Sequence, residues 1–497
     1  MLVAPPHFLI VSFDGLRPDL ISPDLTPNLC RLQAKGVTLA RHRTVYPSET
    51  RTAFPSLVTG ATVDRHGMVG NEYFDRISSP PRSVDTADAR LLRELDRPPR
   101  RPLFGTPTLG EVLAAHGGSL AVLATNTPGT TCLFNHRAED LGHVRLSGHF
   151  RDASTPAAIL REAEECFGPL PPLPRQGEPD LDAQTWITSA FLDLVWPRLR
   201  PDVTVLSYGE PDSCSHANGV GAAKTVAAIA HCDQEFSRVM DWWEAEGRAM
   251  GVHIVAVSDH GHVTGHTRVS VHACIRQAGF SPGAAVGPDV DVVVVPGQVG
   301  ALYLPSVTPS RVTRLTEALM AQPWCGAVFT RPKNDLEGVA PGSLGSHLVF
   351  ARHARSPDVA FSFRADDRMD PYGLVGGAFY DGGQAPGTGV HGGLHPKELA
   401  AVGIVAGAAF LAHGSVSTRP SGICDVMPTV LHVLGIDGPR TMTGRVLTET
   451  LIAPSPERPP ALPEVFEARL GGYWQRLRRV RVGEHHYIEG AEVDGQL

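Results

Sequence analysis

The chain has 497 residues, a formal net charge of −8 and a hydrophobic content of 42%. This length suits a large α/β core with insertions, or two to three domains, and the apolar share can supply a sizeable core. The acidic balance argues against general nucleic-acid binding, which favours a basic surface. It leaves a small anionic substrate open, because a bound metal ion can reverse the local field.

The eight cysteines are scattered and form no CxxC pair. This pattern favours reduced thiols in a cytosolic protein. The first residues, MLVAPPHFLIVSFDG, lead directly into a strand-like run without a basic region, so we expect no secretory signal. No apolar run reaches the roughly 18 residues that a membrane span needs. We therefore expect a cytoplasmic protein without a membrane segment.

Three hydrophobic runs resemble buried strands, and each leads into an acidic residue. Residues 7–13 precede Asp14, residues 203–208 precede Asp212, and residues 252–258 precede Asp259. Their length and β-branched content are typical of strands buried on both faces. In an open α/β sheet, ligands bind outside the carboxyl ends of the strands. A sheet that contains these three strands would gather the three carboxylates at one edge.

The remaining pattern predicts an α/β core with additions. A helix begins near Thr26-Pro27, residues 78–110 form a Pro- and Arg-rich surface excursion, and another helix lies within 220–246. Short strands and one helix at 309–320 predict an inserted cap lobe. The predicted organisation is a core at 1–284 and 386–451, a lobe at 285–385, and a C-terminal tail at 452–497 behind a Pro-rich hinge. The tail shows helical spacing over 464–479 and a basic run at 476–482, which favour a solvated face or a homodimer contact over nucleic-acid binding.

Histidines accompany two of the three carboxylates. His216 follows Asp212 by four positions, His260 directly follows Asp259, and His391 lies in a glycine-rich loop. Carboxylate with imidazole suits Zn²⁺, and also Mn²⁺ or Fe²⁺, better than Ca²⁺, which prefers oxygen ligands alone. An aspartate after a strand can instead cap the next helix. For Asp14 alone the two interpretations are balanced, but for the whole set the metal interpretation is favoured.

Four segments of the sequence resemble the alkaline phosphatase superfamily, and within it the nucleotide pyrophosphatase/phosphodiesterase branch. They occur in the order of that branch, and a further segment, Cys424 to Thr429 with Leu434-Gly435-Ile436, resembles its closing motif. The four segments are Phe13 to Asp19 with Thr26 to Leu29, Tyr46 to Thr50 with Leu57 to Asn71, Glu210 to Asp212 with His216, and Ser258 to Gly261 with His391-Gly392. The resemblance implies an alkaline-phosphatase-like core, with a mainly parallel central sheet flanked by helices.

The resemblance also implies roles for individual residues. One zinc ion would be held by Asp212, His216 and His391. The other would be held by Asp14, Asp259 and His260 together with the oxygen of the nucleophile. Three protein ligands per ion leave positions open for a nucleophile and a substrate oxygen, as a catalytic site requires.

Four hydroxyls precede Leu57-Val58-Thr59-Gly60, and chemistry alone does not choose among Ser48, Thr50, Thr52 and Ser56. The spacing of the resembled family selects Thr50, whose other interpretation is a helix cap. Family resemblance also assigns the amide of Asn71 to the transferring phosphoryl group, although an asparagine after Gly70 is equally typical of a turn.

Arg51 departs from the resembled family, which usually has Phe-Pro-Asn-His after the nucleophile, where this chain has Arg51 to Phe54. A guanidinium here can make bidentate contacts with phosphate, or it can point into solvent.

The combined interpretation is a two-metal hydrolase. It would cleave phosphodiester or phosphoanhydride bonds of small nucleotide-like substrates through a covalent phospho-threonine. A phosphomonoesterase or phosphonate hydrolase of the same superfamily is one alternative. A catalytically inactive, metal-stabilised binding protein is another, which the complete set of ligands and the hydroxyl disfavours.

Overall fold

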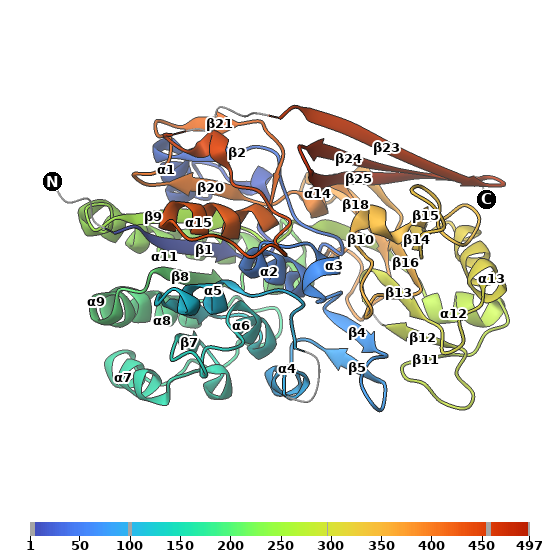
Figure 1. Ribbon diagram of the computed structural model, residues 1–497, viewed down its shortest axis with the longest axis horizontal. Coiled ribbons are helices and arrows are strands. Elements are labelled where there is room, and N and C mark those ends of the chain that lie inside the picture. Colours follow the sequence, from blue (N-terminus) through green and yellow to red (C-terminus); the bar gives the residue numbers. More distant parts are fainter. Residues whose placement is uncertain (1–4, 98–101, 296, 454–458, 496–497) are drawn as a thin grey trace.

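The computed structural model of the protein describes residues 5–97, 102–295, 297–453 and 459–495. A large α/β core lies beside a smaller lobe rich in strands (Figure 1). Most of the Pro- and Arg-rich run at 97–102 and the Pro-rich hinge at 454–458 lie outside the described residues. The rest of the 78–110 excursion contributes strand β5 (Arg82–Asp85) and helix α4 (Ala89–Leu95), whose Leu92 and Leu95 are buried.

The core is organised around one sheet, which has eight strands among the described residues, in the order β21-β2-β20-β9-β1-β8-β6-β7. The five strands from β9 to β7 run parallel, and β20 pairs antiparallel with β9. The bounds are β1 His7–Phe13, β2 Val37–Leu39, β6 Leu120–Ala124, β7 Val144–Ser147, β8 Val203–Tyr208, β9 Val252–Val257, β20 Gly403–Ala406 and β21 Ser415–Ser417. The mainly parallel sheet predicted from the sequence is therefore confirmed.

Helices cover both faces of this sheet, which explains why its strands read as continuous hydrophobic runs. In β1, Phe8 and Ile10 belong to one apolar cluster, while Leu9 and Val11 belong to the other. The first cluster includes residues of α2 (Thr50–Thr59), α3 (Val63–His66), α4 (Ala89–Leu95), α5 (Leu109–Ala115), α6 (Pro128–Phe134) and α15 (Val426–Leu434). The second includes residues of α1 (Pro27–Lys35), α7 (Ala157–Phe167), α8 (Asp182–Ser189), α9 (Trp196–Leu199) and α11 (Ala223–Trp242).

A second sheet forms the strand-rich lobe on the right of Figure 1, in the order β11-β12-β13-β16-β14-β15. Its bounds are β11 Pro282–Gly283, β12 Val292–Val295, β13 Gly300–Tyr303, β14 Cys325–Thr330, β15 Leu344–Gly345 and β16 Val359–Phe363. Helices α12 (Val271–Gln277) and α13 (Pro309–Met320) pack on it and share its apolar cluster. The helix predicted at 309–320 is thus present with those bounds.

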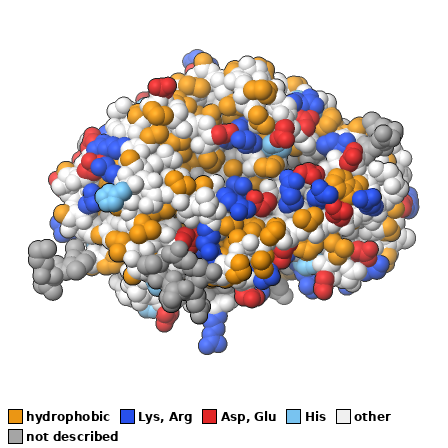
Figure 2. Space-filling view, turned by 90° about the horizontal axis from the view of Figure 1, so that it is seen from above, with side chains coloured by type: hydrophobic (Ala, Val, Ile, Leu, Met, Phe, Trp, Pro, Cys, Tyr) orange, Lys and Arg blue, Asp and Glu red, His pale blue; other side chains and the backbone are white. Residues whose placement is uncertain are grey.

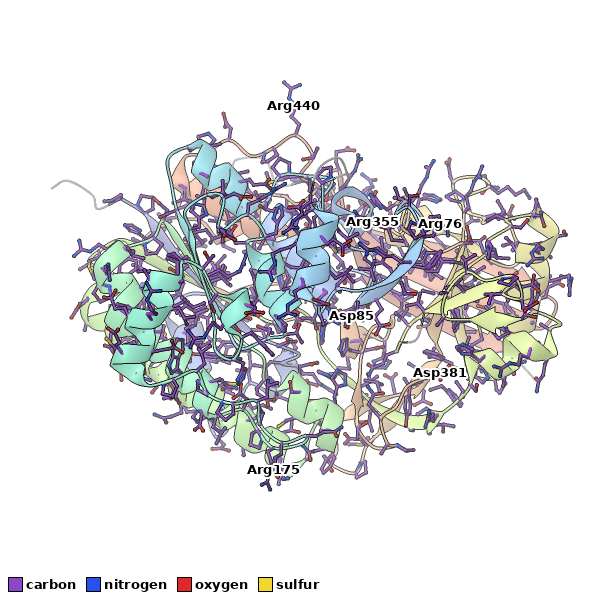
Figure 3. The ribbon with its side chains drawn as sticks, turned by 90° about the horizontal axis from the view of Figure 1, so that it is seen from below. Arg76, Asp85, Arg175, Arg355, Asp381 and Arg440 are labelled. Carbon is purple, nitrogen blue, oxygen red and sulfur yellow. The ribbon has the colours of Figure 1, made fainter. Side chains whose placement is uncertain are left out.

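A four-stranded sheet, β17-β18-β10-β19, links this lobe to the core. Its strands are β10 (Val263–Arg268), β17 (Ala365–Met369), β18 (Val375–Tyr380) and β19 (Gly389–Val390). The hairpin of β4 (Glu72–Asp75) and β5 (Arg82–Asp85) lies at the same junction, where Figure 3 shows Arg76 and Arg355 close together. Arg76 binds Asp358 at 2.9 Å, and Arg355 donates to backbone carbonyls of the core at 2.8 and 3.1 Å.

The C-terminal residues form a three-stranded antiparallel sheet rather than the helix that we predicted over 464–479. Its strands are β23 (Ala461–Leu470), β24 (Tyr473–Val482) and β25 (His485–Gly495). In β24 the buried Tyr473, Gln475 and Leu477 alternate with less buried residues, so the period is two rather than 3.6. The basic run therefore places Arg476 and Arg478 on one face, where they pair with Glu467 and Glu492.

The face seen from above shows basic and acidic side chains interspersed, without one continuous basic patch (Figure 2). No helix among the described residues is both long enough and apolar enough to cross a membrane.

Gln475 joins the C-terminal sheet to the second lobe. Its side chain is fully buried, accepts a hydrogen bond from the Val328 amide at 2.9 Å and donates to the carbonyls of Val328 and Gly342. Gln475→Leu leaves these backbone groups buried and unpaired, so we expect the free energy of unfolding in urea to fall by about 3 kcal/mol. Gln234→Leu, at an exposed position of α11, should change it by less than about 0.5 kcal/mol. Equal effects of the two changes would contradict this role.

Candidate metal centre

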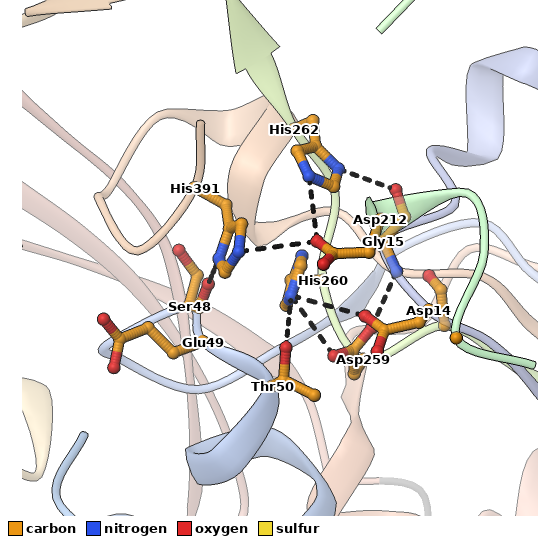
Figure 4. Close-up of polar contacts among 12 residues, drawn as sticks. Asp14, Gly15, Ser48, Glu49, Thr50, Asp212, Asp259, His260, His262 and His391 are labelled. Carbon is orange, nitrogen blue, oxygen red and sulfur yellow. Dashed lines mark hydrogen bonds and ion pairs between the residues drawn. The ribbon is translucent and has the colours of Figure 1, made fainter. Parts of the chain in front are cut away.

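The three predicted carboxylates meet because their strands are neighbours. Strands β9, β1 and β8 lie side by side and parallel, so their carboxyl ends share one edge of the sheet. Asp14 directly follows β1, Asp259 follows β9, and Asp212 is the first residue of α10 (Asp212–Asn218), which follows β8. All three carboxylates point into one cluster (Figure 4).

Asp14, Asp259 and His260 form one group whose ligand atoms all lie within 4.8 Å of one another. Nε2 of His260 is 3.2 Å from Oδ2 of Asp259 and 3.8 Å from Oδ1 of Asp14. Thr50 Oγ1 lies 3.2 Å from the same nitrogen. The set that the family resemblance assigned to one ion is thus brought together next to the hydroxyl.

The other assigned set, Asp212, His216 and His391, is also brought together. Nε2 of His216 is 3.2 Å from Oδ1 of Asp212 and 3.1 Å from Nε2 of His391. His216 lies one helical turn after Asp212 on α10, so both side chains share one face. His391 follows β19, which pairs with β10 through Val390 and Val263 and thereby places His391 beside His262.

His262 is a member of the cluster that the sequence analysis missed. Its Nε2 lies 3.1 Å from Oδ1 of Asp212, and its donor atom belongs to a compact group with Asp212, His260 and His391. The available signal was its position two residues after His260. The neighbouring turn is built around it: Gly15 has φ +70°, and a Cβ there would lie 2.3 Å from the His262 ring.

The four imidazoles are oriented by backbone carbonyls. In each, Nδ1 lies at hydrogen-bond distance from a carbonyl oxygen, which can only accept, so Nδ1 carries the hydrogen and Nε2 presents its lone pair to the cluster. The partners are Gly389 for His216 at 2.8 Å, Gly261 for His260 at 3.0 Å, Gly15 for His262 at 3.0 Å and Ser48 for His391 at 2.8 Å.

The buried polar atoms of this cluster fit a pair of cations. Oδ1 of Asp14, Oδ1 of Asp212, Oδ2 of Asp259 and Nε2 of His262 have no hydrogen-bond partner among the described residues. Buried polar atoms without a partner are destabilising unless an ion satisfies them. Burial, followed by the negative charges of Asp259 and Asp212, holds the pKa of Asp14 well above its ordinary value. A mixed set of oxygen and nitrogen donors suits Zn²⁺, Mn²⁺ or Fe²⁺.

At the end of the cluster that contains Asp212 and His391, both pKa values are lowered. Burial alone would raise the pKa of Asp212, but the imidazoles around it, His216 first, hold that pKa well below its ordinary value. Burial, together with the neighbouring His260, lowers the pKa of His391. Asp212 is therefore ionised and His391 neutral, which are the forms that bind metal ions.

Among the four candidate hydroxyls, Thr50 is the one that faces the cluster. It is the first residue of α2, and Glu49 is the N-cap. The other three are bonded elsewhere: Ser48 donates to the Gly393 carbonyl, Thr52 to the carbonyls of Pro47 and Glu49, and Ser56 to the Thr52 carbonyl. Since Nε2 of His260 accepts, the Thr50 hydroxyl donates its hydrogen to that nitrogen.

Asn71 and Arg51 flank Thr50. The backbone N–H of Arg51 donates to Oδ1 of Asn71 at 3.0 Å, and the side-chain Nδ2 of Asn71 makes no hydrogen bond among the described residues. The Arg51 guanidinium donates to Thr86 at 2.8 Å and lies 3.9 Å from Asp85. Arg51, Asn71, His216 and His391 all line one pocket of about 220 Å³ between the core and the second lobe. Asp85 lies at this junction in Figure 3.

Comparison with known proteins places this geometry in a family. The sequence profile described as type I phosphodiesterase/nucleotide pyrophosphatase matches residues 8–359. Bis(5'-adenosyl)-triphosphatase of Mus musculus is 23% identical over 58% of this chain and 56% of that protein. Ectonucleotide pyrophosphatase/phosphodiesterase family member 3 of Mus musculus is 22% identical over 52% of this chain and 25% of that protein. The chain thus spans about half the length, or less, of these relatives.

A solved structure shares the fold. Murine ectonucleotide pyrophosphatase/phosphodiesterase 5, an inactive threonine-to-alanine variant in complex with AMP, superposes with a TM-score of 0.57. The alignment covers 87% of this chain and 96% of that chain at 16% identity. The fold predicted from the sequence resemblance is therefore confirmed.

The loop that carries His391 is held by Glu398, whose carboxylate accepts from the backbone amides of Gly393 and His395. Burial raises the pKa of Glu398 from an ordinary value of 4.5 to about 7. Between these values the folded protein keeps a proton that the unfolded chain has released. Stability from this group is therefore lost as the pH rises from 4.5 to 7, by about 3 kcal/mol in total.

Glu398→Gln removes this titration. Raising the pH from 4.5 to 8 should lower the unfolding free energy of the unsubstituted protein by about 3 kcal/mol more than that of the variant. Both are measured in urea with a chelator present throughout. Glu317→Gln, at an exposed position of α13, should leave the profile unchanged. Parallel profiles for the Glu398 variant and the unsubstituted protein would show that Glu398 does not titrate in this range.

Proposed function

Because the chain belongs to the type I phosphodiesterase/nucleotide pyrophosphatase family, we propose that it is a metal-dependent hydrolase of phosphodiester or phosphoanhydride bonds. The observation that carries the proposal is the Thr50 hydroxyl, which lies 3.2 Å from His260 at the edge of the Asp/His cluster and beside a pocket. A hydroxyl beside carboxylate and imidazole atoms that have no hydrogen-bond partner among the described residues is an arrangement that suits an activated nucleophile.

The relatives support this reaction class. Their names include a bis(5'-adenosyl)-triphosphatase and nucleotide pyrophosphatase/phosphodiesterases, and the related solved structure binds AMP. That solved protein is an inactive threonine-to-alanine variant, which agrees with a threonine as the catalytic residue. Nucleotide-like phosphate esters are therefore the first substrates to assay.

Two divalent metal ions, most readily zinc, would lower the pKa of the Thr50 hydroxyl and offset the charge of the phosphoryl oxygens when bound. Asp212, His216 and His391 would hold one ion. Asp14, Asp259 and His260 would hold the other, together with the Thr50 oxygen. The ring of His262 contacts Asp212 and limits the positions that this carboxylate can take.

Thr50, Asn71 and Arg51 have separate roles in the reaction. The Thr50 hydroxyl loses its proton to solvent as its oxygen bonds to phosphorus and the bond from phosphorus to the leaving oxygen breaks, which gives a phospho-threonine and the released leaving group. Water then cleaves that ester, releases the phosphoryl product and restores the hydroxyl. The free amide of Asn71 and the guanidinium of Arg51 donate hydrogen bonds to the non-bridging oxygens and stabilise the charge that they carry.

Thr50→Ala tests the nucleophile. We expect kcat for bis-p-nitrophenyl phosphate to fall at least about a thousandfold, because the other three candidate hydroxyls are bonded to backbone carbonyls away from the cluster. Metal content, measured by elemental analysis, should stay at the unsubstituted level, since six other ligands remain. Thr308→Ala, at the exposed N-cap of α13, is the matched control and should keep full activity. Full turnover by the Thr50 variant would remove the assignment.

A phosphomonoesterase or phosphonate hydrolase is the second candidate, and the position of Arg51 favours it. Its side chain is largely buried and beside Thr50, and one more positive charge near phosphorus suits a dianionic monoester better than a monoanionic diester. If this candidate holds, Arg51→Leu lowers kcat/KM for the dianionic p-nitrophenyl phosphate, or for a dianionic alkylphosphonate, at least about tenfold more than for the monoanionic bis-p-nitrophenyl phosphate. Equal losses on the three substrates would reject it.

A further inference from the structure

The pocket beside Thr50 is small. Its volume is about 220 Å³, whereas pockets for drug-sized ligands usually measure roughly 300–1,000 Å³. It lies between the first turn of α2 and the segment 297–301 that leads into β13. Once the phosphoryl group lies beside Thr50, the remaining space fits a short organic group.

The pocket also offers no aromatic face for a nucleobase. Its walls are aliphatic at Val69, Val299 and Ala360. Apart from histidine rings, the one aromatic side chain that lines it among the described residues is Tyr46, which is 0% exposed and packs on Phe329. Stacking on an aromatic side chain contributes roughly 1–3 kcal/mol per base, and this contribution is missing here.

The aromatic residue that follows the nucleophile in sequence does not supply such a face either. Phe54 lies in α2, is fully buried, and packs on Phe134 with ring centroids 4.4 Å apart. It belongs to the apolar cluster on one face of the central sheet. Position 51, next to Thr50, is an arginine whose side chain is held by Thr86.

Glu49 brings a free hydrogen-bond acceptor to this pocket. Its Oε2 accepts from the backbone N–H of Asn71 at 2.6 Å, while none of the described residues donates to its Oε1. The carboxylate lies between two glycines: a Cβ on Gly70 would be 3.4 Å from Oε2, and a Cβ on Gly392 would be 3.6 Å from Oε1. Figure 4 shows that this carboxylate turns away from the metal-ligand cluster. It therefore faces the organic part of a bound ester rather than the ions.

The remaining charged side chain at this end of the pocket is also an acceptor. Glu72 lines the pocket and stands opposite Asp85 across the β4–β5 hairpin. Arg51, next to Thr50 in sequence, lines the same pocket and lies 3.9 Å from Asp85, so its guanidinium can contact the phosphoryl oxygens. A substrate group that carries hydrogen-bond donors would satisfy Glu49, whereas an anionic group would meet Glu49 and Glu72.

We propose that the pocket beside Thr50 selects phosphate esters with a short aliphatic group that carries a hydroxyl or an ammonium, and that Glu49 is the residue that recognises this donor. The proposal rests on the proposed function, because it concerns the ester group of the same reaction. The pocket is therefore expected to prefer an ester with a short donor-bearing group over a nucleoside ester. A hydroxyl and an ammonium are recognised in the same way, because each donates a hydrogen bond to a carboxylate oxygen.

The test compares four p-nitrophenyl phosphodiesters that differ in the second ester group: 2-hydroxyethyl, 2-aminoethyl, ethyl and 5'-thymidyl. In assays at pH 8.5, above the pKa of about 7 to which burial raises the Glu49 carboxyl, we expect kcat/KM for the better of the hydroxyethyl and aminoethyl esters to exceed that of the ethyl ester at least about tenfold. A hydrogen bond to a charged group is worth about one factor of ten or more. The order of those two esters shows whether the donor is hydroxyl or ammonium. The thymidyl ester should be slower than the ethyl ester.

Glu49→Gln separates recognition from reactivity. The glutamine carbonyl oxygen can still accept from the backbone N–H of Asn71, but its NH₂ group is a donor where Oε1 was an acceptor. The preference for the donor-bearing ester over the ethyl ester should therefore fall to threefold or less. Glu72→Gln is the matched control at the same pocket and should keep the preference. A fastest thymidyl ester, equal rates for the ethyl and donor-bearing esters, or an unchanged preference in the Glu49 variant would overturn the proposal. Absence of turnover with all four esters in the unsubstituted protein would instead contradict the proposed function.

Discussion

The structure depends on the mutual repulsion of buried acceptor atoms at one end of the central sheet, four of which no donor among the described residues satisfies. Three carboxylates and four imidazole lone pairs face one another at the end of the central sheet, with Nε2 of His216 only 3.1 Å from Nε2 of His391. Such a cluster is unfavourable by itself, because desolvation and like charge both oppose it. Cations between the two groups would remove both costs, so metal binding and the local structure would stabilise each other.

The rest of the fold keeps these atoms in place. Parallel neighbours β9, β1 and β8 fix the three carboxylates at one edge, and the pairing of β10 with β19 brings His391 back from a distant part of the chain. Backbone carbonyls set the ring orientation of every histidine in the cluster. The positive φ of Gly15 leaves room for His262. The same arrangement places the N-terminus of α2, and with it the Thr50 hydroxyl, against the cluster, so the position of this hydroxyl and of the adjacent pocket follows from strand order.

Sequence reasoning reached the parts of this site that local pattern determines. Asp14, Asp212 and Asp259 were found because buried strands are recognisable and their carboxyl ends converge. The choice of Thr50 and His391 needed family resemblance, since their contacts cross more than 200 residues. His262 was missed because its role depends on a turn that only the folded chain shows. The C-terminal sheet was misread as helix because arginines on one face of a strand mimic an amphipathic helix in a short segment. The pocket was unreadable, because residues from both lobes line it.

The central claim is that six of these side chains, three carboxylates and three imidazoles, bind two metal ions beside Thr50, while His262 positions Asp212. Crystals grown with zinc, measured on both sides of the zinc absorption edge, test it most directly. The account predicts two anomalous peaks, one among Asp212, His216 and His391, and one among Asp14, Asp259 and His260 next to the Thr50 oxygen. A map without peaks in this cluster, or with zinc bound only elsewhere on the chain, would contradict it.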